Sequence, residues 1–134
     1  MRWMLDTNTC IAIIKRQPDS AIRKLRGKSI GQVGLSSVAL GELTYGAEVS
    51  ARPDQNLQAL HEFLLPLDIA SYDEACAFRY GQLRAQLKKK GRPLGALDIL
   101  IAAHALTLEV TLVTHNTAEF SHAAGLRLED WLET

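Results

Sequence analysis

Two patterns of hydrophobic residues alternate along the chain: short continuous runs, and longer segments in which hydrophobic residues recur at helical spacing. Runs such as Trp3-Met4-Leu5 and Thr111-Leu112-Val113-Thr114 are typical of buried strands. Leu57, Leu60 and Leu64 instead recur at the spacing expected for one face of a helix. The pattern predicts strands at residues 3–5, 31–36, 67–69, 111–114 and 126–128, and helices at residues 7–15, 19–25, 37–47, 53–65, 71–90, 96–108 and 120–124.

Strands that alternate with helices predict an α/β fold, with a mostly parallel central sheet of about four to five strands flanked by helices. We expect Asp19 or Ser20 to cap the second helix, and a Ser71…Glu74 capping box to start the longest one. Ligands of such folds collect beyond the carboxyl ends of the strands. Polar side chains at those positions are therefore candidates for function.

The composition is that of an ordinary globular protein. A length of 134 residues and a hydrophobic content of 47% fit one domain, residues 1–134, and argue against disorder. Cys10 and Cys76 lie in apolar surroundings without a metal-site partner, which favours a reduced, cytoplasmic protein. No apolar run reaches the ~20 residues of a membrane span. The N-terminus is too short and too soon charged to be a signal peptide.

Basic residues are unevenly distributed, although Lys+Arg and Asp+Glu each number 15. Twelve of the fifteen basic residues lie in segments 15–41 and 75–97, and the second segment includes Lys88, Lys89, Lys90 and Arg92. Two interpretations are open: solvated helix faces, or a basic surface that binds a polyanion.

Four carboxylates stand alone in otherwise uncharged segments: Asp6, Glu42, Asp98 and Glu119. A buried carboxylate loses hydration, which hydrogen-bond donors, basic side chains or a metal ion must compensate. Each acid also has a structural alternative. Asp6 is placed to cap a helix and Asp98 to favour a helix dipole. Glu42 would lie on an exposed helical stripe and Glu119 in a solvated loop.

Asp6 and segment 113–116 both lie at or just beyond apparent strand ends, where parallel topology brings side chains together. Carboxylate oxygens without cysteines or paired histidines favour Mg²⁺ or Mn²⁺. Such an ion serves phosphoryl transfer, because it activates water and neutralises phosphate charge. His104 is predicted to be a core or surface residue rather than a ligand. His115 lies near the predicted site, where contact with substrate is the alternative to a surface role.

Four motifs, in order along the chain, resemble those of PIN-domain ribonucleases, and specifically of VapC toxins from type II toxin–antitoxin systems. They are Met4-Leu5-Asp6-Thr7-Asn8-Thr9 and segments 36–47, 92–105 and 112–120, followed by a C-terminal segment at 125–131. The match covers nearly the whole chain. It implies a small PIN-like α/β domain.

The resemblance also implies site residues. Asp6, Glu42 and Asp98 match the acidic triad that holds Mg²⁺ or Mn²⁺. Many PIN domains have a further aspartate where this chain has Asn116, so either Asn116 or Glu119 is expected to complete the catalytic set. Thr7 and Thr114 match supporting hydroxyl groups of the family. Apart from the resemblance, the uneven charge distribution leads us to expect that Lys88, Lys89, Lys90 and Arg92 bind substrate.

The implied activity is Mg²⁺-dependent hydrolysis of structured RNA by a toxin, through in-line attack of metal-activated water that leaves 5′-phosphate and 3′-hydroxyl ends. The expected substrate is tRNA or ribosomal RNA, with the anticodon stem-loop of initiator tRNA favoured. A VapB-type antitoxin would inhibit the enzyme, which is expected to form a homodimer through apolar helices at 57–64 and 99–108, unless these pack in the core.

Three alternatives to this function remain open from the sequence. The first is a PIN nuclease outside a toxin–antitoxin system, acting in RNA processing or on DNA flaps. The second is a non-catalytic PIN module that binds RNA or metal. The third is a receiver-like signalling module, which is disfavoured because no acid precedes Asp6.

Overall fold

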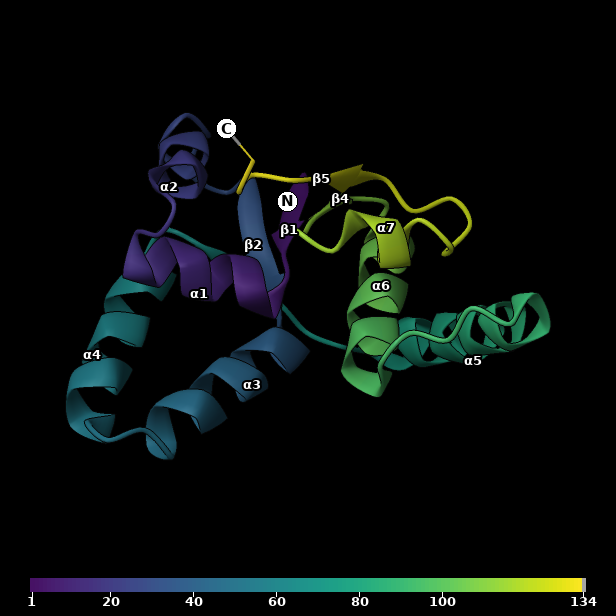
Figure 1. Ribbon diagram of the computed structural model, residues 1–134, viewed down its shortest axis with the longest axis horizontal. Coiled ribbons are helices and arrows are strands. Elements are labelled where there is room, and N and C mark those ends of the chain that lie inside the picture. Colours follow the sequence, from purple (N-terminus) through teal and green to yellow (C-terminus); the bar gives the residue numbers. More distant parts are fainter. Residues whose placement is uncertain (134) are drawn as a thin grey trace.

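The computed structural model describes residues 1–133. Five strands in this part of the chain form a single sheet. The strands are β1 (Trp3–Leu5), β2 (Val33–Ser36), β3 (Asp68–Ala70), β4 (Thr111–Val113) and β5 (Leu128–Glu129). Their order across the sheet is β3-β2-β1-β4-β5, and each neighbouring pair is parallel (Figure 1). The predicted α/β class with a parallel sheet is confirmed.

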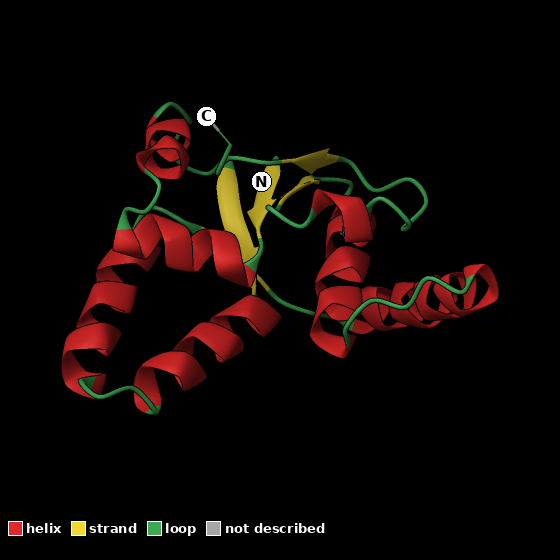
Figure 2. Ribbon diagram, viewed as in Figure 1, coloured by secondary structure: helices red, strands yellow, loops and turns green. Residues whose placement is uncertain are grey.

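Seven helices connect the strands in the described chain. They are α1 (Thr7–Lys15), α2 (Asp19–Arg26), α3 (Ser37–Glu48), α4 (Pro53–Leu64), α5 (Glu74–Lys90), α6 (Ala96–Leu108) and α7 (Thr117–Phe120). Figure 2 shows α1, α3 and α4 to one side of the strands and α5 and α6 to the other. The reason is topological: the chain passes from β1 to β3 in one direction and then returns to β4 beyond β1, and right-handed crossovers put the two sets of helices on opposite faces.

The central strands form the middle of the core. All four residues of β2 are buried, and Leu5, Leu35 and Leu112 are inaccessible to solvent. Gly34 lies where β3 approaches closely, because a Cβ at this position would overlap the carbonyl oxygen of Asp68. The glycine is therefore required by the close packing of the two backbones.

Two predicted helix caps are wrong. Helix α5 begins at Glu74, and Asp73 rather than Ser71 caps it, by accepting a hydrogen bond from the backbone N–H of Cys76. Helix α2 has Pro18 at its N-cap and no side-chain cap. The hydroxyl of Ser20 instead donates to the carbonyl oxygen of Leu132, a tertiary contact that local sequence does not reveal.

Element boundaries differ most near the C-terminus. The short helix covers Thr117–Phe120 rather than 120–124, and the last strand covers Leu128–Glu129 rather than 126–128. Phe120 is buried and ends its helix in the core. Helix α6 also packs in the core, since Ile99, Ile101 and neighbouring alanines are buried, so most of this helix is not free to form a dimer contact. No helix within residues 1–133 is long and apolar enough to cross a membrane.

Candidate active site

Sheet register brings three polar residues to one level at the carboxyl ends of the central strands. Leu5 pairs with Leu35 on one side and with Val113 on the other. The next residue in each chain segment is Asp6, Ser36 or Thr114. Because the strand order reverses between β1 and β4, Asp6 and Thr114 flank the switch point where α/β folds bind ligands.

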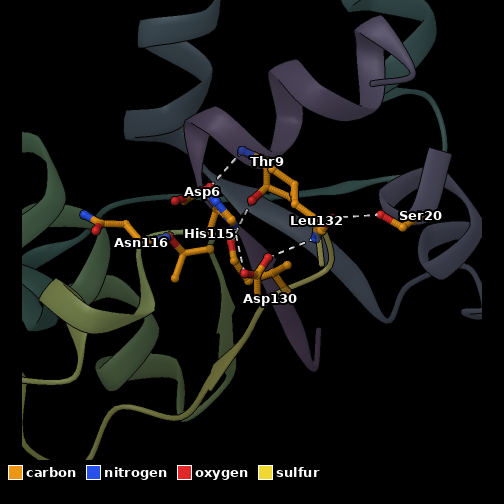
Figure 3. Close-up of polar contacts among 9 residues, drawn as sticks. Asp6, Thr9, Ser20, His115, Asn116, Asp130 and Leu132 are labelled. Carbon is orange, nitrogen blue, oxygen red and sulfur yellow. Dashed lines mark hydrogen bonds and ion pairs between the residues drawn. The ribbon is translucent and has the colours of Figure 1, made fainter. Parts of the chain in front are cut away.

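Asp6 is buried and also caps a helix. Its Oδ1 accepts a hydrogen bond from the backbone N–H of Thr9 at 2.8 Å, and its own N–H donates to the carbonyl oxygen of Val113 at 3.0 Å (Figure 3). The structural alternative, an N-cap, is therefore correct. The cap employs one carboxylate oxygen and leaves Oδ2 for a ligand, so the two roles are compatible.

Glu42 is half-buried on α3 and is held by the start of α1. The hydroxyl of Thr7 donates to Glu42 Oε1 at 2.7 Å. This bond joins residues that are 35 positions apart in the chain. It restricts the glutamate to one orientation, next to the residue that follows Asp6.

Asp98 lies in the first turn of α6 and is half-buried. Burial raises the pKa of this carboxyl group, and the negative charges of Asp6, Glu42 and Glu119 raise it further. Asp6, Glu42 and Glu119 are therefore each close enough to Asp98 for their charges to act on it, and we call these four residues the acidic cluster. Within residues 1–133 no Lys or Arg forms an ion pair with any of them, so their charge is not balanced by the protein.

Asn116 and Glu119 lie together at the exposed side of the acidic cluster. Asn116 donates through Nδ2 to Glu119 Oε2 at 2.9 Å, and its backbone N–H donates to the hydroxyl of the buried Thr114 at 3.0 Å. Glu119 is exposed, as its structural alternative predicted. The two residues named as alternatives for completing the site are thus hydrogen-bonded to each other.

The donor chemistry fits a hard divalent cation. In the described part of the chain, no three His, Cys, Asp or Glu side chains lie close enough together to hold a metal ion between them. Carboxylates without basic partners nevertheless favour a cation, and Mg²⁺ typically binds to one or two carboxylates while it keeps several waters. An open acidic cluster suits this mode better than the closed geometry of a structural metal site.

Comparison with known proteins assigns the family. The family model described as PIN domain matches residues 3–126. The chain belongs to the PIN-domain family. The resemblance indicated by the four sequence motifs is thereby confirmed.

Two curated relatives match this PIN domain along almost its full length. The tRNA(fMet)-specific endonuclease VapC of Shigella flexneri is 45% identical over 131 residues, which are 98% of each chain. Ribonuclease VapC2 of Rickettsia felis is 41% identical over 132 residues, again 98% of each chain. In a solved structure of VapBC2 from Rickettsia felis bound to a DNA fragment from their promoter, one chain superposes with a TM-score of 0.92 at 40% identity, covering 98% of this chain and 99% of that one.

The predicted basic residues do not gather at the acidic cluster. Lys88, Lys89 and Lys90 are exposed at the C-terminal end of α5, which lies at the outer edge of the PIN domain in Figure 1, and the ammonium group of Lys90 donates to the carbonyl oxygen of His122. Arg92 is exposed in the segment that returns from this end to α6. These basic side chains therefore do not line the acidic cluster.

Sequence reasoning missed two hydrogen-bonded histidine pairs near the strand ends. His104 is buried, with its Nδ1 2.8 Å from the hydroxyl oxygen of Ser36, and burial lowers its pKa. This confirms that it is a core residue. His115 lies 2.9 Å from Asp130 (Figure 3). No local pattern marks Asp130, because its partner is 15 residues away.

Proposed function

We propose that this PIN domain is a divalent-metal-dependent endoribonuclease, the toxin of a toxin–antitoxin pair, and that residues 1–134 act as a single domain. The observation that carries the proposal is the acidic cluster at the switch point of the sheet. Burial and the neighbouring charges raise the pKa of Asp98 there, and the four acids have no basic partner within residues 1–133. Full-length similarity to proteins named endonuclease and ribonuclease supports the same activity.

We assign the metal to Asp6, Glu42 and Asp98, with Mg²⁺ as the physiological ion and Mn²⁺ as an effective substitute. When bound, such an ion supplies a more acidic water and neutralises charge on the phosphate. The fold of the protein positions the three carboxylates. The helix cap orients Asp6, the Thr7 hydroxyl orients Glu42, and the first turn of α6 supports Asp98. These fixed carboxylates would place water in line with an RNA phosphodiester, which yields 5′-phosphate and 3′-hydroxyl ends.

Glu119 is the better candidate to complete the catalytic set, with Asn116 as its positioning residue. The Asn116 amide donates to one Glu119 oxygen, which leaves the second oxygen to accept a proton from water. Thr114 is buried and supports Asn116 through the backbone N–H. This arrangement uses the amide in place of the aspartate that many PIN domains carry.

The proposed substrate is a tRNA, and specifically the anticodon stem-loop of initiator tRNA, as the name of the Shigella flexneri relative suggests. Helix α5 is 17 residues long, which corresponds to about 25 Å. The exposed cluster Lys88–Lys90 is therefore placed to contact a stem remote from the cut, and Arg92 lies on the path between them. Such phosphate contacts position an RNA without reading its sequence.

We further propose a VapB-type antitoxin as the partner, because a structural neighbour is the VapBC2 pair. An apolar cavity of about 540 Å³ between α1, α2 and α4 is a suitable docking surface, since it is lined by side chains such as Ile13, Ile22 and Phe63 and has Arg16, Arg26 and Lys28 around it. An acidic, amphipathic segment would complement this surface. We retain the homodimer and the cytoplasmic location as parts of the proposal.

The test is cleavage of a synthetic anticodon stem-loop of initiator tRNA by the purified protein, with Mg²⁺, with Mn²⁺ and with a chelator. We expect cutting at one position with either ion and none with the chelator, and mapping of the products should reveal 5′-phosphates. The matched variant is Asp98→Asn, which removes a charge while keeping the shape. Cleavage by this variant at the wild-type rate would refute the assignment, and binding without any cleavage would indicate the non-catalytic alternative.

A further inference from the structure

The side chains of His115 and Asp130 contact each other, and within residues 1–133 no other carboxylate contacts a basic side chain. His115 Nδ1 lies 2.9 Å from Asp130 Oδ2, and the histidine side chain is 62% exposed whereas that of the aspartate is 13% exposed. The second aspartate oxygen, Oδ1, accepts a hydrogen bond from the backbone N–H of Leu132 at 2.9 Å. The Leu132 carbonyl in turn accepts from Ser20, so the aspartate is held in place by the packed C-terminal segment (Figure 3).

The pair lies at the edge of the acidic cluster. His115 directly follows Thr114, which is at the level of Asp6 across the β1–β4 pair. Figure 3 shows the histidine between Asp6 and Asp130, with Asn116 on its other side. Whether the ring is charged or neutral, such an exposed pair contributes little to folding stability. The fixed orientation of an exposed ring beside the proposed site therefore calls for another explanation.

The aspartate determines which imidazole nitrogen carries the proton in the neutral ring. An ionised carboxylate has no hydrogen to donate, so Nδ1 must be the donor to Asp130. The other nitrogen, Nε2, is then left as a hydrogen-bond acceptor on the exposed side of the ring. A ligand group that forms a hydrogen bond with Nε2 therefore has to be a donor, and phosphate oxygens are not donors. On an RNA strand the donor next to each backbone phosphate is the ribose 2′-hydroxyl.

We propose that His115 accepts a hydrogen bond through Nε2 from the 2′-hydroxyl of one nucleotide adjoining the cleaved phosphate, and that Asp130 is the positioning residue for this contact. The inference rests on the proposed function and adds to it a determinant of RNA over DNA. The 2′-hydroxyl is not the nucleophile in water attack. Removing it therefore tests recognition rather than the chemical step.

The experiment compares binding of one stem-loop RNA, the anticodon stem-loop of initiator tRNA, with versions that each carry a single 2′-deoxy substitution near the cut. Binding is measured by fluorescence anisotropy with Ca²⁺ in place of Mg²⁺, for the wild type and for His115→Ala. One deoxy substitution should weaken wild-type binding about 3- to 10-fold, the worth of a neutral hydrogen bond, and have no effect on the variant. The control variant His61→Ala, at an exposed histidine of α4, should behave like the wild type.

Asp130→Asn provides a second readout that does not need RNA. The asparagine oxygen has to keep accepting from the Leu132 N–H, so its NH₂ group would face His115 Nδ1 and force the ring proton onto Nε2. Long-range ¹H–¹⁵N correlation spectra at about pH 7.5 should locate the proton on Nδ1 in the wild type and on Nε2 in the variant. A wild-type ring protonated on Nε2, or on both nitrogens, would overturn the proposal.

The remaining outcomes separate this inference from the proposed function. Cleavage of the parent RNA together with equal deoxy effects in wild type and His115→Ala would reject the role of His115 and leave the nuclease function intact. A His115-dependent deoxy effect without cleavage would support the contact and reject the nuclease. Failure of the wild type to bind any of the RNAs would reject both the His115 contact and the proposed nuclease function.

Discussion

Replacing Asp6 by asparagine and by alanine separates its two roles, helix cap and proposed metal ligand. Asparagine caps a helix about as well as aspartate, whereas alanine costs about 1 kcal/mol. The cap bond to the Thr9 N–H, 2.8 Å long, should therefore survive in Asp6→Asn and be lost in Asp6→Ala. Asp6→Asn also removes a charge that raises the pKa of Asp98, so we expect this variant to be at least as stable as the wild type.

Both variants should lose activity to a similar extent. Loss of an outer-shell partner of a metal typically costs 10- to 100-fold, and loss of a ligand should cost more, so we expect a drop of more than about 100-fold in the cleavage rate. In thermal unfolding followed by circular dichroism, Asp6→Ala should melt about 3–5 °C below Asp6→Asn, as expected for 1 kcal/mol in a chain of this size. Stability and activity would then be uncoupled at one residue.

Two results would refute this reasoning. An Asp6→Asn variant that cuts RNA at the wild-type rate would mean that Asp6 is a cap alone. An Asp6→Asn variant that melts as low as Asp6→Ala would mean that the carboxylate charge, not the hydrogen bond to Thr9, stabilises the start of α1. Heating both variants with and without a chelator would show whether a bound ion obscures the comparison.

Four further predictions concern other parts of the PIN domain. Burial and like charges raise the pKa of Asp98 in the folded state, so the metal-free wild type should lose stability as the pH rises through that raised pKa, whereas Asp98→Asn should not. Denaturant unfolding at several acidic pH values measures this difference. Identical dependence of stability on pH in the two proteins would contradict the prediction. Mg²⁺ at about 100 times its Kd should stabilise the wild type by about 2.7 kcal/mol, and Thr7→Val should need more Mg²⁺ for the same melting shift; calorimetry that detects no shift in the wild type would count against the ion. Gly34→Ala should lower the melting temperature by several degrees, because its Cβ would overlap the backbone of β3, whereas Gly41→Ala, with open space around it, should not. The side chain of Ile30 is 89% exposed and lines the cavity between α1, α2 and α4. Ile30→Asp should therefore weaken co-purification with the antitoxin and leave RNA cleavage unchanged. Normal co-purification of this variant would mean that the cavity is not part of the antitoxin interface.

The sequence by itself determined the fold class and the main candidates for chemistry. Strand and helix periods are local properties, so the alternation of elements and the parallel sheet were predictable from spacing alone. The isolation of Asp6, Glu42 and Asp98 among apolar residues was equally visible, since a charge in a core segment needs compensation. Their roles as metal ligands stay predictions.

Only the tertiary structure decided how these side chains are held and what surrounds them. The Thr7–Glu42 bond, the Ser36–His104 contact and the His115–Asp130 pair each join residues far apart in the chain. Such pairs depend on strand order and register, which arise from packing of the whole sheet and leave no trace in any short segment. For the same reason, the sequence placed Lys88–Lys90 at the end of a predicted helix but did not indicate that this end would lie away from the carboxylates.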